Sequence, residues 1–203
     1  MAHPLMTTVD DFVAGLLDLK RDLITLDRVS TYIKSVPVSR EALESYTYWN
    51  DERYTRNLIY RDELFEVMTI CWQPGQRTAA HTHNGQLGWM TVPQGNVTVE
   101  NYRHVSCNAE ERQNVVGLDC LGGATQITME RLEKTDWAVS DVVATVDKIH
   151  TIHRISNDEK GEGAISLHIY SKPFDSCIAF DLANQRCFRR TLSYYSRFGR
   201  LEV

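Results

Sequence analysis

The first apolar positions of the chain recur with the spacing of an α-helix. After Thr8 they stand at Phe12, Val13, Leu16, Leu17 and Leu23. Residues with this spacing share one face of a helix. Thr8 is a candidate N-cap, and Asp11 follows in the first turn, where an acidic side chain is favourable. The pattern predicts a helix that packs one face on the rest of the protein.

Two more helical segments are expected before the pattern changes. The segment LDRVSTYIKSV, residues 26–36, predicts a short helix that ends before Pro37, because the residue before a proline disfavours the helical region. A third helix is expected to start at the cap candidate Ser39. Residues 1–50 therefore predict a helical cap.

After about Tyr54 the chain consists of short segments rich in β-branched and aromatic residues, separated by Gly, Pro, Asn or Asp. Such segments are typical of strands. They cover residues 64–72, 87–93, 96–105, 123–132, 137–146, 148–156 and 164–171. Helices followed by many short strands favour a mainly β fold, an antiparallel sandwich or small barrel with an N-terminal helical cap. The sequence has no repeat or linker, so residues 1–203 are expected to form a single domain, with 51–203 as the barrel.

Composition and charge narrow the range of partners. The 203 residues are 42% hydrophobic and 24% charged, as in an ordinary globular protein, and a formal net charge of −5 offers no basic stripe for nucleic acid. No apolar run reaches the roughly 20 residues that span a bilayer, and the N-terminus lacks the pattern of a signal peptide. We expect a cytoplasmic protein with a small polar partner and no membrane association. The sequence does not indicate whether the chain is a monomer or a homo-oligomer.

The cysteines are odd in number and form no C-x-x-C pair: Cys71, Cys107, Cys120, Cys177 and Cys187. This argues against a disulfide framework and against a cysteine zinc site. We expect free thiols. His104 stands near two of these cysteines, but without ligand spacing, so no second metal site is expected there.

Two histidines stand one residue apart in the stretch between Gly75 and Gly95. Side chains at i and i+2 of a strand share one face, so His81 and His83 can direct both imidazoles at one ion. The flanking glycines permit tight turns at the ends of a hairpin that would aim the histidines inward. Such a pair taken alone is equally consistent with a solvated strand face.

A third histidine follows in the segment KIHTIHRISN. His153 precedes Asn157 with H-x3-N spacing, whereas His150 lies on the opposite face of the same strand. We therefore expect His153 to complete the metal site and His150 to lie at the surface or behind a ligand.

These two segments resemble the paired motifs of the cupin superfamily, whose small, jelly-roll-like antiparallel β-barrel carries a metal at its centre. Residues 54–72, the three histidines and the segment SLHIYSKPFD, residues 166–175, together resemble the cysteine dioxygenases. These are iron enzymes that oxidise a thiol to a sulfinate with both atoms of dioxygen. The resemblance runs from Tyr54 to about Gly199. It implies Fe(II), dioxygen as co-substrate and no organic cofactor.

The resemblance also implies roles for single residues. His81, His83 and His153 match the iron ligands, and Arg56 matches the arginine that binds the substrate carboxylate. Tyr54, two residues before Arg56, is expected to face the same cavity. Three neutral imidazoles leave a divalent ion with its full charge, so the site should favour an anionic ligand such as the substrate thiolate. The substrate amine is implied as a further ligand.

Tyr170 matches the active-site tyrosine of the family, and Ser166 and His168 match its partners in a hydrogen-bonded relay. The residues themselves support this, because they alternate at i, i+2 and i+4 through an otherwise apolar strand. If that face points into the barrel, hydroxyl, imidazole and phenol can bond in series.

Gly88 departs from both patterns. Cupins usually have a glutamate at this position of the first motif, and in animal cysteine dioxygenases a cysteine there is cross-linked to the tyrosine. The sequence resembles the bacterial branch, and Tyr170 is expected to remain an ordinary phenol. Glycine is also expected to leave extra room beside the iron.

The expected function is oxidation of L-cysteine to cysteine sulfinic acid. Two other substrates stay open, 3-mercaptopropionate and mercaptosuccinate. Relatives specific for mercaptopropionate usually carry glutamine where this chain has Arg56, and a dicarboxylic thiol needs a second cation, for which Arg77 and Arg154 are candidates. A zinc, manganese or nickel cupin with isomerase or hydrolase activity and a ligand-sensing cupin are the alternatives from other classes.

Overall fold

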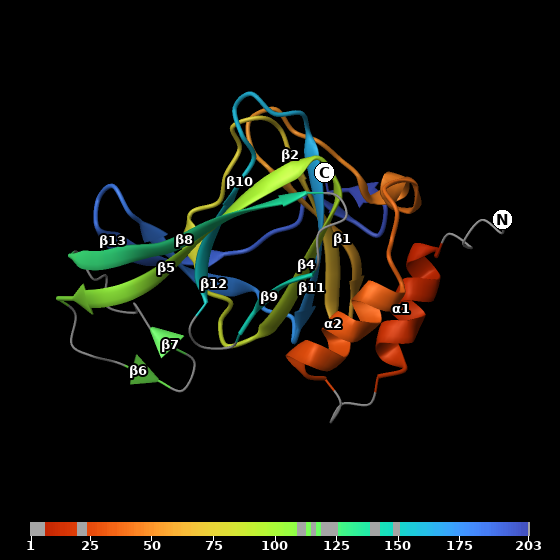
Figure 1. The fold of residues 1–203 in the computed structure, drawn as a ribbon, viewed down its shortest axis with the longest axis horizontal. Coiled ribbons are helices and arrows are strands. Elements are labelled where there is room, and N and C mark those ends of the chain that lie inside the picture. Colours follow the sequence, from red (N-terminus) through yellow and green to blue (C-terminus); the bar gives the residue numbers. More distant parts are fainter. Residues whose placement is uncertain are drawn as a thin grey trace.

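The computed structural model describes residues 7–19, 24–108, 113–114, 117–118, 126–138, 143–147 and 151–202. In these ranges helical segments come first and β-strands follow (Figure 1). Within the described ranges no helix is long and apolar enough to cross a membrane.

The first two predicted helices are confirmed as α1 (Val9–Leu17) and α2 (Leu26–Ser35). The hydroxyl oxygen of Thr8 accepts a hydrogen bond from the backbone N–H of Asp11 at 3.1 Å, as expected for the N-cap. The second helix ends before Pro37, as predicted.

The third helical segment differs from the prediction. It is a 3-10 helix, η2 (Glu41–Tyr46), and not an α-helix. Six residues give fewer than two α-helical turns, and short connectors of this kind commonly adopt the tighter 3-10 geometry. Ser39 accepts a bond from the N–H of Ala42 at 3.3 Å but precedes the helix by two positions. Leu23, expected in the first helix, lies outside the described residues.

Two β-sheets form the body of the protein. One has seven strands in the order β15, β14, β1, β2, β11, β4 and β9, and the other has six in the order β13, β12, β3, β10, β5 and β8. The strands of the first are β1 (Thr55–Arg61), β2 (Glu66–Trp72), β4 (Leu87–Gln94), β9 (Ala144–Val146), β11 (Ala164–Ser171), β14 (Ser196–Arg197) and β15 (Arg200–Leu201). Those of the second are β3 (Ala80–His81), β5 (Asn96–Cys107), β8 (Ile127–Ala138), β10 (Ile152–Ser156), β12 (Ser176–Asp181) and β13 (Arg186–Thr191). A separate pair consists of β6 (Gln113–Asn114) and β7 (Gly117–Leu118).

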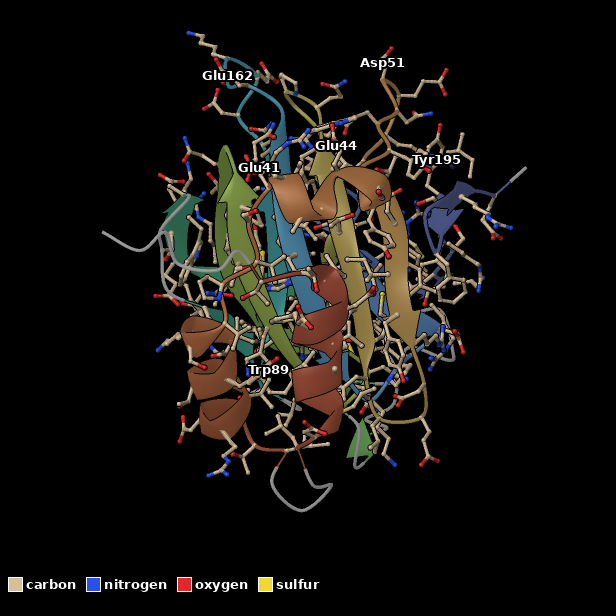
Figure 2. All side chains as sticks on the ribbon, turned by 90° about the vertical axis from the view of Figure 1, so that its right-hand side faces the viewer. Glu41, Glu44, Asp51, Trp89, Glu162 and Tyr195 are labelled. Carbon is tan, nitrogen blue, oxygen red and sulfur yellow. The ribbon has the colours of Figure 1, made fainter. Side chains whose placement is uncertain are left out.

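The helices cover the outer face of the seven-stranded sheet, on the right of Figure 1. Buried apolar side chains of the helices and of the sheet form one cluster there, including Phe12, Leu16, Val29, Ile33, Leu43, Val67, Trp89, Leu167 and Ile169. Trp89, labelled in Figure 2, also donates its indole N–H to the carbonyl oxygen of Leu26 at 3.0 Å. The cap is thus held both by apolar packing and by a hydrogen bond to the sheet.

β11 is buried on both faces because it lies inside the seven-stranded sheet and beneath the helices. Leu167 and Ile169 pack in the helix-covered cluster. Ser166, His168 and Tyr170 alternate with them and lie on the opposite face, toward the six-stranded sheet. The polar row of the sequence therefore points into the barrel.

These sheets confirm the mainly β, cupin-type barrel with an N-terminal helical cap. The predicted strand over 164–171 has the same bounds as β11. Strands β1 and β12 were not predicted. The histidine hairpin is wrong, since β3 pairs with β10 and β12, whereas β4 belongs to the other sheet.

The prediction that all cysteines are free thiols is also wrong. Cys71, Cys107 and Cys177 carry thiols, but Cys187 is disulfide-bonded. Cys120 lies outside the described residues. An odd cysteine count and the absence of a C-x-x-C pair do not exclude a bond between cysteines distant in sequence.

Candidate metal centre and substrate cavity

Three histidine side chains converge on the inner face of the six-stranded sheet. His81 ends β3 and lies opposite His153 of β10 in the antiparallel register, and His83 follows two residues later. One ligand nitrogen from each residue lies within 4.8 Å of the other two. The ring centroids are 4.6 to 5.2 Å apart. The structure thus brings together the three residues that the sequence predicted as metal ligands.

Burial keeps these imidazoles neutral. It lowers the pKa of His81 to about 4 and the pKa values of His83 and His153 well below the usual 6.5. Nδ1 of His81 lies 2.9 Å from the carbonyl oxygen of Ala79. Since a carbonyl only accepts, Nδ1 carries the hydrogen and Nε2 keeps its lone pair.

The histidine nitrogens fit a metal ion. Among the described residues, neither ring nitrogen of His83 nor Nε2 of His153 has a hydrogen-bond partner, although all are buried. Buried polar atoms are normally bonded, so such atoms call for a partner from outside the chain. Three neutral imidazoles suit divalent transition metals, including iron and zinc. No described carboxylate joins the cluster, so a bound ion would keep its charge and favour an anionic ligand.

Ser166, His168 and Tyr170 form a hydrogen-bonded row on β11. Oγ of Ser166 lies 2.8 Å from Nε2 of His168, and Nδ1 of His168 lies 3.2 Å from the hydroxyl of Tyr170. Trp72 of β2 extends the row by donating its indole N–H to Oγ of Ser166 at 2.8 Å. Burial lowers the pKa of His168 to about 3 and raises the pKa of Tyr170, so both groups are neutral near pH 7.

The indole N–H of Trp72 determines which group donates in each hydrogen bond of this row. Because Ser166 accepts from Trp72, its own hydrogen is left to donate, and in the described part of the chain Nε2 of His168 is the acceptor within reach. Neutral His168 then carries its hydrogen on Nδ1 and donates it to the Tyr170 oxygen. The hydroxyl hydrogen of Tyr170 is left free to donate to a group in the cavity.

Arg56 of β1 is held by a carboxylate that the sequence did not predict. Its Nη2 donates to Oε1 of Glu66 at 3.1 Å, and the hydroxyl of Tyr194 donates to the same oxygen at 2.8 Å. The Glu66 side chain is fully buried, and that of Arg56 is 11% exposed. Burial raises the pKa of Glu66, and the charge of Arg56 acts in the opposite direction. The lone acidic residue within the apolar run LFEVMTICW was the sequence signal for this pair.

A cavity of about 40 Å³ joins Arg56 to the histidine cluster. Its lining includes Tyr54, Arg56, His81, Tyr170, Cys177 and Arg190. The ring of Tyr54 stacks on Trp72 with 4.9 Å between centroids. The two predicted substrate-binding residues therefore share one space with a predicted metal ligand and the tyrosine.

A second cavity, of about 240 Å³, also reaches the cluster. It is lined by His83, His153, His168 and Tyr170, together with Gly88 and side chains of β5, β8 and β9. Tyr170 lines both cavities. The histidines can thus be approached from two spaces, of which only the smaller contains Arg56.

Gly88 lines the larger cavity beside His83 and His153, but the position that a Cβ atom would take there is already occupied. It lies opposite Tyr170 in the pairing of β4 with β11 and opposite Val146 in the pairing with β9. A Cβ atom at this position would lie 2.6 Å from Cγ2 of Val146 and 2.9 Å from Cδ1 of Tyr170. These distances are shorter than van der Waals contact. Val146 and Tyr170 fill the space toward which a side chain at position 88 would point.

The two arginines considered as second cations lie elsewhere. Arg154 forms an ion pair with Glu100. The side chain of Arg77 is exposed, and its backbone forms an isolated β-bridge with Ser156. Arg190 lines the Arg56 cavity instead. Its place at the cavity was not predicted. His150 lies outside the described residues.

The barrel and its histidine cluster define a cupin with a candidate metal site. The family model described as cysteine dioxygenase type I matches residues 3–183, and the chain belongs to this family. Membership of this family supports dioxygenase activity on a small-molecule substrate.

Proteins named cysteine dioxygenase type 1 from Rattus norvegicus and Homo sapiens are 26% identical to this chain over 196 residues, covering 92% of it and 88% of their own length. The protein of that name from Danio rerio is 24% identical over 195 residues. Among solved structures, TT1209 from Thermus thermophilus has a TM-score of 0.44 at 17% identity, over 64% of this chain and 95% of its own. KdgF from Halomonas sp. has a TM-score of 0.44 at 16% identity, over 65% and 92%.

Proposed function

We propose that the protein is an iron(II)-dependent thiol dioxygenase that converts L-cysteine to cysteine sulfinic acid. The supporting observation is the cavity in which a neutral histidine, Arg56 and Tyr170 meet. In this reaction the thiol sulfur gains both atoms of one dioxygen molecule (R–SH + O2 → R–SO2H). Sulfur loses the four electrons that reduce dioxygen, so neither an external reductant nor an organic cofactor is needed.

His81, His83 and His153 would hold the iron. When bound, iron supplies the redox chemistry by which dioxygen oxidises the sulfur. Because three neutral ligands cancel none of its charge, the site favours a thiolate over a thiol at the remaining positions. No described carboxylate belongs to the cluster, and the thiolate of the substrate would supply the negative charge instead.

Arg56 and Tyr54 would bind the remainder of the substrate. A guanidinium presents a planar fork that matches a carboxylate. Glu66 and the carbonyl of Ser193, which accepts from Nη1 at 3.4 Å, hold Arg56 in place before substrate binds. Tyr54, stacked on Trp72, closes the cavity on one side.

Tyr170 would donate its hydroxyl hydrogen to a reacting sulfur or oxygen atom. His168 and Ser166 act through Tyr170 by orienting its oxygen, and the direction set by Trp72 keeps the hydrogen available. A donor held in place before the reaction stabilises developing negative charge without reorganisation.

The same cavity also suits 3-mercaptopropionate, which offers the same thiol and carboxylate. Mercaptosuccinate adds a second carboxylate. A cupin isomerase, hydrolase or ligand sensor would require neither Arg56 nor the relay. The single domain over residues 1–203 and the cytoplasmic location stay predictions, and a disulfide at Cys187 is unusual for a reducing compartment.

The decisive experiment is oxygen uptake by anaerobically iron-loaded protein with L-cysteine, 3-mercaptopropionate and mercaptosuccinate in parallel. Products are identified by mass, and zinc-loaded protein and Arg56→Gln serve as controls. We expect uptake with L-cysteine, formation of the sulfinate, and loss of both in the controls. Uptake with only another thiol would correct the substrate, and no uptake with any thiol would reject the enzyme class.

A further inference from the structure

Arg190 is a second cation in the substrate cavity. It lies on β13 opposite Cys177 of β12, and both side chains line the cavity that contains Arg56 and His81. Its guanidinium lies 5.9 Å from the ring centroid of Tyr54, which lines the same cavity. Burial raises the pKa of the Cys177 thiol to about 11, and the positive charge of Arg190 acts against this rise. These observations place Arg190 at the cavity rather than on a remote surface.

The two arginines of the cavity differ in their partners. Arg56 forms an ion pair with the buried carboxylate of Glu66. No described carboxylate lies within ion-pair distance of Arg190. The side chain is exposed, so its donors are open to a ligand that enters from solvent.

This difference determines the charge that an incoming substrate meets. Arg56 and Glu66 cancel as a pair, so among the described side chains that line the cavity Arg190 supplies the net positive charge. The planar guanidinium of Arg56 can still form bidentate hydrogen bonds with a carboxylate. The neutral Arg56–Glu66 pair, however, attracts a distant anion only weakly. A guanidinium without a carboxylate partner attracts it more strongly and adds charge-assisted hydrogen bonds.

We infer that Arg190 binds the substrate carboxylate together with Arg56 and thereby selects thiols with one carboxylate. The inference rests on the proposed function and specifies its substrate class. Arg56, Glu66 and Arg190 together carry a single positive charge, which one carboxylate neutralises. A thiol without a carboxylate, such as cysteamine, leaves that charge uncompensated. A dicarboxylic thiol brings one negative charge too many.

The test is anaerobic titration calorimetry of iron(II)-loaded protein with L-cysteine, cysteamine and mercaptosuccinate. Arg190→Gln is expected to weaken L-cysteine binding about tenfold, the usual effect of losing one charge-assisted hydrogen bond, and to leave cysteamine unchanged. Arg189→Gln is the matched control, because Arg189 is the adjacent exposed arginine of the same strand and donates to Oγ of Ser176 at 3.1 Å. It should bind all three thiols like the wild type.

Glu66→Gln tests the charge argument by removing a negative charge instead of a positive one. This variant keeps the shape of the side chain but gives the cavity two uncompensated cations, so binding of mercaptosuccinate should strengthen severalfold relative to L-cysteine. Equal affinities of Arg190→Gln and the wild type for L-cysteine would overturn the inference. An equal loss of cysteamine affinity in Arg190→Gln would also overturn it, because it would indicate a structural role. The same holds if Glu66→Gln keeps the wild-type ratio of affinities for mercaptosuccinate and L-cysteine.

Oxygen uptake measured on the same samples separates this inference from the proposed function. If the binding pattern holds and no oxygen is consumed, Arg190 is confirmed and the dioxygenase is wrong. If oxygen is consumed and Arg190→Gln behaves as the wild type, the dioxygenase stands and the role of Arg190 is wrong. A wild type that binds none of the thiols would overturn both.

Discussion

The two sheets of the barrel contribute opposite kinds of polar groups to the space between them. The six-stranded sheet presents histidine nitrogens, several of which have no hydrogen-bond partner in the described part of the chain. The seven-stranded sheet presents groups that bind one another, in the row from Trp72 to Tyr170 and in the pair of Arg56 with Glu66, although Oε2 of Glu66 has no hydrogen-bond partner among the described residues. The first wall therefore offers groups that could bind an ion from outside, whereas the polar groups of the second bind one another on folding. Substitutions on the two walls should have distinguishable effects.

The largest effect is expected from the wall that needs an ion. His153→Ala removes one of three proposed ligands, so iron content after anaerobic loading and oxygen uptake should both fall by at least about 100-fold, more than the loss of an outer partner of a ligand costs. Metal analysis by mass spectrometry measures the first quantity. His104→Ala is the control, because His104 lies on β5 outside the cluster. Full iron content in His153→Ala would exclude it as a ligand.

A substitution on the seven-stranded sheet should lower turnover without lowering iron content. Tyr170→Phe removes a hydrogen-bond donor but no ligand, so we expect turnover to fall about 100-fold while iron content stays unchanged. The measurement is oxygen uptake per bound iron. Tyr60→Phe serves as control, since the hydroxyl of Tyr60 donates to Asp62 and does not line either cavity. Loss of iron in Tyr170→Phe would show that the walls are not independent.

A smaller effect, on stability, tests how closely the walls are packed. Gly88→Ala forces a Cβ against Val146 and Tyr170, so the free energy of unfolding should fall by about 1–3 kcal/mol, the usual cost of overpacking. Urea denaturation measures it. Adding Val146→Ala to the variant should restore part of the loss, because it removes the nearer contact at 2.6 Å and leaves the contact with Tyr170 at 2.9 Å. An unchanged midpoint in Gly88→Ala would show that the strands adjust without cost.

The smallest effect concerns the direction of the relay. Trp72→Phe keeps an aromatic ring but removes the N–H, so Ser166 is no longer held as a donor and His168 should populate both neutral tautomers. We expect turnover to fall about threefold to tenfold, of the order of one lost hydrogen bond, with iron content unchanged. Nitrogen-15 NMR of labelled histidine reports the tautomer of His168.

Trp89→Phe is the matched control for this experiment. It also removes one indole N–H from the seven-stranded sheet, but that group bonds to the helical cap. It should lower stability and leave the His168 tautomer unchanged. An unchanged tautomer in Trp72→Phe would contradict the assigned direction.

The sequence predicted the parts of the site that depend on local alternation. β11 was predicted with correct bounds, and its polar face could be recognised because Ser166, His168 and Tyr170 interrupt a regular apolar strand. His81 and His153 were recognisable as residue types that bind metals. Their contact depends on the pairing of β3 with β10, which spacing along the chain does not show.

The features that were missed depend on partners distant in sequence. Glu66 meets Arg56 across β1 and β2, and Arg190 reaches the cavity only because β13 pairs with β12. Cys187 is the one buried residue of β13, so an exposed arginine of this strand carries no sequence signal of a place at a cavity. The close approach of Val146 to Gly88 was not predicted either, because it comes from a third strand.

β11 also constrains how this protein can change during evolution. Its two faces serve different ends, with Leu167 and Ile169 under the helices and Tyr170 at the cavity. Deleting or inserting one residue would exchange the faces, exposing the relay to the apolar cap and the apolar side chains to the cavity. Variation in substrate preference is therefore expected to accumulate at edge positions such as Arg190, while β11 stays fixed in length.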